Sequence, residues 1–166
     1  KYRPKIIVSG ASAYPRKIDF QKFGKIAEKV GAYHLADISH IAGLISAGLH
    51  QSPFSYADIV MTTTHKTLRG PRAAVLFSKK SISEAINKAI FPGLQGGPHN
   101  NIVAAIALTF GEALKPRFKN YQKQIIKNAK VLAKELKNYG FNLITNGTDN
   151  HLILIDLKNL GMNGLE

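Results

Sequence analysis

The stretch ADIVMTTTHKT, residues 57 to 67, contains the features on which the fold and the chemistry depend. Ala57 to Thr62 is an apolar run of strand length, and further hydroxyls, an imidazole and an amine follow it directly. Ligands of open α/β sheets bind at the carboxyl ends of strands, where the amine of Lys66 could attack a carbonyl group. A polar turn with a solvated lysine would contain the same residues, so this segment alone leaves both interpretations open.

Helical patterns separate this strand from other apolar runs. The predicted strands are Ile6 to Val8, Tyr33 to Asp37, Ala57 to Thr62 and Ala73 to Phe77. Asp19 is placed to cap a helix that ends at Gly31, and a short helical stretch runs from His40 to Ala47. Strands that alternate with helices predict an α/β fold with a mostly parallel sheet, covered by helices on both faces.

The second half of the chain is predicted to be mainly helical. Ser81 and Glu84 fit a capping box that opens a helix, and a loop rich in glycine and proline follows at 91–98. Two more helices are expected, the second with Pro116 in its first turn and Gly140 at its C-terminal end. The last predicted elements are a turn at Asn146 to Asn150 and a strand at His151 to Leu157.

The composition narrows the class of function. Lysine and arginine number 23 against 10 aspartates and glutamates, which gives a net charge of +13. The densest basic stretch, Lys115 to Lys137, has helical periodicity, and this favours a solvated surface and small anionic ligands over a nucleic-acid site. Without cysteine, neither disulfides nor a zinc finger can form, and we expect no metal site and a reducing, cytoplasmic compartment. The apolar runs are too short to span a bilayer, so no membrane association is expected.

Asp37 strengthens the interpretation of Lys66. It also ends a predicted strand, and one strand–helix–strand unit separates it from Lys66, so the two strand ends could be neighbours in one sheet. A carboxylate there could pair with a protonated pyridine nitrogen and keep a pyridoxal ring cationic, which makes the ring an electron sink. A role for Asp37 in capping the following helix stays open at this point.

Five blocks of sequence together resemble one enzyme family. Residues 60–72, VMTTTHKTLRGPR, look like the cofactor-lysine signature of the serine hydroxymethyltransferases. The other blocks, in the family's order, are Ser9 to Tyr14, Ala36 to Leu44, Phe91 to Pro98 and Thr148 to His151. The resemblance implies the aspartate-aminotransferase-like fold, fold type I, of pyridoxal-phosphate enzymes. It further implies a large cofactor-binding domain over 1–115, a connecting helix over 116–140 and the start of a small C-terminal domain over 141–166.

The resemblance assigns catalytic roles around the lysine. Lys66 is expected to carry pyridoxal 5'-phosphate as a Schiff base, and Asp37 to bind the pyridine nitrogen. Thr63 would support the lysine and its proton transfers. His65 would approach the phosphate and influence substrate specificity.

The remaining site residues are also implied by the resemblance. Ser12 and His40 would lie at the cofactor ring and its phenolic oxygen, and Arg72 would order the charges of the site. Gly96 and Gly97 would reach the cofactor phosphate of the other subunit, which implies a homodimer with shared active sites. Glycine suits such a loop because no side chain keeps its backbone from an anion. The alternatives are an ordinary turn hydroxyl for Ser12, a histidine at a helix end for His40, a structural ion pair for Arg72, and a plain turn for Gly96 and Gly97.

The activity implied by the resemblance is the reversible interconversion of serine and glycine in one-carbon metabolism, with tetrahydrofolate as the carrier. A related pyridoxal-phosphate enzyme such as a threonine aldolase is the nearest alternative, and a basic nucleic-acid-binding domain is an alternative of a different class. The family pattern places further active-site residues upstream and downstream of these 166 residues, so we expect the chain alone to be inactive. Ser39 stands where alanine is usual in the family, and Ala73-Ala74 replaces a pair of glycines.

Overall fold

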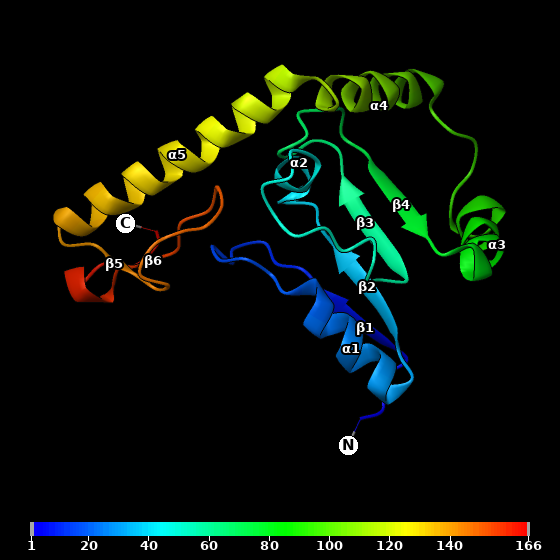
Figure 1. Ribbon diagram of the computed structural model, residues 1–166, viewed down its shortest axis with the longest axis horizontal. Helices are drawn as coiled ribbons and strands as arrows, with labels where there is room; N and C mark the ends of the chain where they lie inside the picture. The colour runs from blue at the N-terminus through cyan, green and yellow to red at the C-terminus, as the bar shows by residue number, and fades with distance from the viewer. Residues whose placement is uncertain (1, 166) are drawn as a thin grey trace.

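A central sheet has the strand order β1-β2-β3-β4 (Figure 1). The computed structural model describes residues 2–165. The strands are β1 (Ile6–Ser9), β2 (Tyr33–Asp37), β3 (Ile59–Thr63) and β4 (Ala74–Ser78). β1, β2 and β3 are parallel, whereas β4 pairs antiparallel with β3. The prediction of an α/β fold with a mostly parallel sheet is therefore confirmed.

The connections between the strands explain these directions. α1 (Phe20–Val30) lies between β1 and β2, and α2 (Ala42–Ser46) lies between β2 and β3, so both connections are crossovers. As predicted, the Asp19 side chain caps α1 by accepting a hydrogen bond from the backbone N–H of Lys22 in the first turn. Gly31 ends the helix with a φ of 67°. The loop 64–73 contains no helix, and it returns the chain as an antiparallel neighbour.

The helix after β4 begins differently from the prediction. α3 (Lys80–Lys88) is preceded by Lys79, and no side chain caps it. Ser81 is therefore already inside the first turn, where its hydroxyl cannot serve as the cap, and the predicted capping box is wrong. The next element, η1 (Ala89–Leu94), is interrupted at Phe91 and Pro92, whose backbone is not helical, so the chain leaves the helix where the loop 91–98 is predicted to begin.

Two long helices follow this loop, α4 (Asn100–Ala113) and α5 (Pro116–Asn138). Gly140, with a φ of 86°, donates its backbone N–H to the carbonyl of Lys137 at 3.0 Å and closes the end of α5 as predicted. None of the helices within residues 2–165 combines the length and the apolar character needed to cross a bilayer. The division into domains at 115 and 140 stays a prediction.

The C-terminal part forms a small hairpin in place of the longer strand predicted at 151–157. Its elements are β5 (Asn142–Leu143), β6 (Ile155–Asp156) and a short 3-10 turn, η2 (Lys158–Leu160). The Asn150 side chain accepts the backbone N–H of Leu152 at 2.8 Å. This local bond satisfies the backbone N–H of Leu152, and cross-strand bonding starts only further on, where the backbone N–H of Ile144 donates to the Leu154 carbonyl at 3.0 Å.

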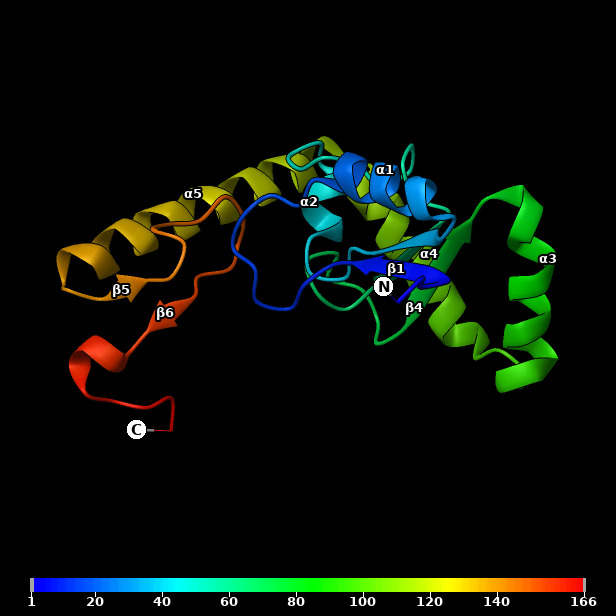
Figure 2. The same cartoon turned by 90° about the horizontal axis from the view of Figure 1, so that it is seen from below.

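The core lies on one face of the sheet. Ala36 and Val60 are buried and pack with Phe20 of α1 and Phe118 of α5. On the opposite face Val8 is 62% exposed. Cover on both faces was expected, but within residues 2–165 α3 stands beside the β4 edge and α5 extends away from the sheet (Figures 1 and 2).

Candidate active site

The parallel strands β1, β2 and β3 all point the same way (Figure 1). A cleft lies at their carboxyl edge. Its volume is about 280 Å³. Five of the residues singled out in the sequence line it: Ser12, Asp37, His40, Thr63 and Lys66. They are the last residues of β2 and β3 or lie in the loops after β1, β2 and β3, so the parallel arrangement brings them together.

Lys66 lies three residues beyond the end of β3, and its side chain turns back to that strand. Its Nζ donates a hydrogen bond to Thr63 Oγ1 at 3.0 Å. The turn that carries it is closed by the backbone N–H of Arg69, which donates to the Lys66 carbonyl at 3.0 Å. The Oγ1 of the fully buried Thr64 donates to the carbonyl of Pro71 at 2.6 Å. The amine is therefore presented by a loop whose backbone is held from within.

Neighbouring elements hold the same loop from outside. Thr67 Oγ1 donates to the carbonyl of His40 and accepts the backbone N–H of Gly43, both at 3.0 Å. The fully buried Gln122 of α5 donates its Nε2 to the Thr67 carbonyl at 2.8 Å. A Cβ on Gly43 would lie 2.5 Å from that carbonyl oxygen, so only glycine allows this approach. Bonds to both α2 and α5 thus fix the position of the lysine loop.

The carboxylate of Asp37 is oriented by Ser39. Asp37 Oδ1 accepts the Ser39 Oγ hydrogen at 2.6 Å and the Ser39 backbone N–H at 3.0 Å. Ser39 Oγ in turn accepts the backbone N–H of Thr63 at 3.0 Å. A Cβ on Gly10 would overlap the Asp37 carbonyl, so the β1 loop passes close over this residue. Oδ2 accepts no hydrogen bond from residues 2–165, which leaves it available to a ligand in the cleft.

Two histidines lie together beside the cleft. The rings of His40 and His151 stack with centroids 6.1 Å apart and planes 15° apart. Burial lowers the pKa of His40, and Lys66 lowers it further, while Asp37 opposes the change. Burial likewise lowers the pKa of His151, with a smaller contribution from His40. Both shifts favour the neutral form of the imidazole ring.

The structure leaves four of the predicted residues outside this cleft. His65 does not line it, although its Nδ1 is buried and has no hydrogen-bond partner within residues 2–165. Arg72 is exposed on the approach to β4. Gly96 and Gly97 lie in the exposed loop before α4, with no atom within 4 Å of an added Cβ. Their assigned roles stay predictions.

Two residues of the site, Ser39 and His151, were not predicted from the sequence. Ser39 was noted only as a departure from the family pattern, yet its position two residues after Asp37 suits a side-chain-to-backbone turn. His151 had no signal of its own beyond its place in the block Thr148 to His151. Its partner lies on a distant segment, and side-chain periodicity carries no information about such a contact.

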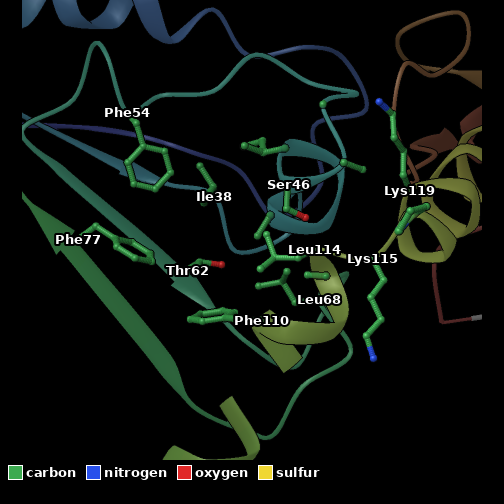
Figure 3. Close-up of a pocket in the computed structure, with 16 residues that line it drawn as sticks. Ile38, Ser46, Phe54, Thr62, Leu68, Phe77, Phe110, Leu114, Lys115 and Lys119 are labelled. Carbon is green, nitrogen blue, oxygen red and sulfur yellow. The ribbon is translucent and has the colours of Figure 1, made fainter. Parts of the chain in front are cut away.

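A larger and mainly apolar cavity of about 690 Å³ lies on the helix-covered face of the sheet (Figure 3). Phe77 and Phe110 border it, and Thr62 of β3 faces it. Lys115 and Lys119 stand at its rim with their amines turned away from its centre. Neither Lys66 nor Asp37 lines this cavity, so the candidate active site is the smaller cleft.

Comparison with known families identifies the enzyme family of the chain. The family model described as serine hydroxymethyltransferase matches residues 1–166, the whole chain. The members of this family are pyridoxal-phosphate-dependent hydroxymethyltransferases of fold type I, and the mostly parallel sheet flanked by helices suits that fold. The chain therefore belongs to the serine hydroxymethyltransferase family.

Proposed function

We propose that the chain takes part in the reversible interconversion of serine and glycine, with tetrahydrofolate as the one-carbon carrier. The observation that carries the proposal is that Lys66 Nζ and the Asp37 carboxylate, from neighbouring strand ends, line one cleft. The family match favours this reaction over that of a threonine aldolase.

The residues of the cleft fit pyridoxal 5'-phosphate. The free Oδ2 of Asp37 is suited to a protonated ring nitrogen, and Lys66 Nζ is suited to a covalent bond with an aldehyde carbon. Ser12 and His40 border the same space and would contact the ring. The buried, unpartnered Nδ1 of His65 supplies a polar atom for which a phosphate is one suitable partner. When bound, the cofactor withdraws electrons from the substrate Cα.

The protein contributes positions and protons. Thr63 Oγ1 holds Lys66 Nζ at 3.0 Å, which keeps the amine at one place when it is displaced by the amino group of a substrate. Ser39 keeps the Asp37 carboxylate from rotating, so Oδ2 would be held ready for the ring nitrogen. We assign Arg72 to the ordering of anionic groups at the edge of the site, a role that its exposure permits.

The proposal extends to partners and location. Gly96 and Gly97 stand in an exposed loop with open space around both residues, which suits contact with the cofactor phosphate of a second subunit in a homodimer. The net charge of +13 suits folates with polyglutamate tails. If so, folate affinity should weaken with added salt and strengthen with tail length. A cytoplasmic location is part of the proposal, as the cysteine-free chain suits a reducing compartment.

Chemical labelling tests the central assignment. The protein is mixed with pyridoxal phosphate, the imine is reduced with borohydride, and the labelled peptide is mapped. We expect the label on Lys66, its loss in Lys66→Ala, and its retention in Lys25→Ala, which removes an exposed lysine of α1. Stoichiometric label on another lysine, with Lys66 unmodified, would exclude the assignment.

A further inference from the structure

The segment before His151 is anchored to the loop that carries Ser12. The backbone N–H of Asp149 donates to the carbonyl of Pro15 at 2.8 Å, and Asn150 Nδ2 donates to the carbonyl of Tyr14 at 3.0 Å. Asn150 is 1% exposed, so its amide bonds are shielded from water. These bonds join two segments far apart in the sequence and determine where the next residue lies.

His151 emerges from this anchor directly against His40. The two rings are nearly parallel, at 15°, with centroids 6.1 Å apart. The Nδ1 of His151 is buried and bonds nothing within residues 2–165, so no hydrogen bond explains the orientation of this ring. The ring of His151 instead stacks on that of His40, which lines the Lys66 cleft.

The charges around the pair make a neutral stack the stable arrangement. His40 faces Lys66 of the β3 loop, Asp37 at the end of β2, and His151 of the C-terminal segment. His151 faces His40. A proton on either ring would place a cation beside Lys66 or beside another imidazole in a partly buried site. Two neutral rings avoid this repulsion and keep their contact.

We propose that His151 is a positioning residue, whose ring holds the His40 ring in place at the mouth of the Lys66 cleft. This inference rests on the proposed function for its consequence, because His40 would contact the cofactor ring. The stack itself is a property of the protein without ligand. A C-terminal segment would thereby control how firmly the cleft holds a pyridoxal compound.

Three substitutions separate stacking from simple filling of space. His151→Leu keeps an apolar volume but has no ring, His151→Phe keeps a ring of similar shape, and His99→Ala removes an exposed histidine before α4. NMR titration of the His40 ring protons, without ligand, reports how that ring is held. The dissociation constant for pyridoxal phosphate is measured in parallel.

We expect His151→Leu to raise the pKa of His40 toward 6.5, because the released ring turns into water. The dissociation constant should rise about three- to tenfold, as expected from loss of an aromatic pair. His151→Phe and His99→Ala should stay within about twofold of the unsubstituted protein. If His151→Leu and His151→Phe behave alike, the ring has no positioning role and the inference is wrong. If the unsubstituted protein binds no pyridoxal phosphate while the His40 titration responds as expected, the proposed function fails and the stack stands.

Discussion

Replacement of Ser39 by alanine tests how the carboxylate of the site is held. The Ser39 hydroxyl donates to Asp37 Oδ1 at 2.6 Å and accepts the backbone N–H of Thr63 at 3.0 Å. The last paired residues of β2 and β3 are Asp37 and Met61. The Ser39 hydroxyl therefore joins the two strand ends two residues beyond this last pair. Alanine keeps the backbone N–H bond to Asp37, so the substitution removes only the contribution of the hydroxyl.

The expected loss of stability follows from these two bonds. A hydrogen bond to a charged group contributes about 1.5–3 kcal/mol, and a buried N–H left without a partner costs about 1–3 kcal/mol. Ser39 is 6% exposed, but the bond to Thr63 is only partly buried, and water can replace part of the loss. We therefore expect Ser39→Ala to lower the free energy of unfolding by about 1–3 kcal/mol, which corresponds to about 2–10 °C in Tm.

Urea unfolding of Ser39→Ala, followed by circular dichroism, measures this change. Ser83→Ala is the matched control, because the Ser83 hydroxyl bonds only the carbonyl of Lys80 within its own exposed helix. The control should stay within about 0.5 kcal/mol of the unsubstituted protein, and both variants should keep its denaturant slope. A change for Ser39→Ala as small as that of the control would refute the view that its hydroxyl joins the strand ends.

Four further substitutions test other parts of the structure. Gly43→Ala should destabilise the protein by about 1–3 kcal/mol and reduce labelling at Lys66, since its Cβ would overlap the Lys66 loop. Gly111→Ala, in open space within α4, should stabilise by up to about 1 kcal/mol, as differential scanning calorimetry can show. Burial lowers the pKa of His50, so its contribution to stability is complete above pH 6.5 and is lost as the pH falls through the folded-state value. Unfolding titrations from pH 7.5 to pH 5 should show this decline, and His50→Gln should reduce it. Arg16 pairs with Asp149 at 2.9 Å, and Arg16→Gln should speed amide hydrogen exchange at 145–150 about fivefold, whereas unchanged exchange would mean that other bonds hold the segment.

Local patterns were sufficient where local interactions decide the structure. Asp19 and Gly31 bound α1 as predicted, because a cap and a left-handed glycine act within one turn. The convergence of Asp37 and Lys66 was also predictable, since parallel strands place their carboxyl ends at one edge. The capping box at Ser81 failed because the N-cap is Lys79, two residues earlier, and two possible starts so close together cannot be separated by residue type alone.

Interactions between distant segments were not predictable in this way. The hydrogen bonds of Asn150 and the stack of His151 on His40 depend on where the C-terminal part is placed, and α5 decides that placement. The role of Ser39 depends on Thr63, which lies on another strand. A pattern within one segment specifies which face a residue occupies, but not which residue of another segment it meets.

The neighbouring threonines of β3 show how strictly the site depends on strand register. Thr62 is 3% exposed and faces the large apolar cavity, whereas Thr63 points to the opposite side and holds the lysine amine. Side chains alternate along a strand, so a shift of one residue would exchange these positions. Pairing with β4, where Thr63 lies opposite Ala74, and the bond from Thr63 to Ser39 both oppose such a shift. The antiparallel strand and the serine hydroxyl therefore act on the same property, namely which of two adjacent hydroxyls meets Lys66.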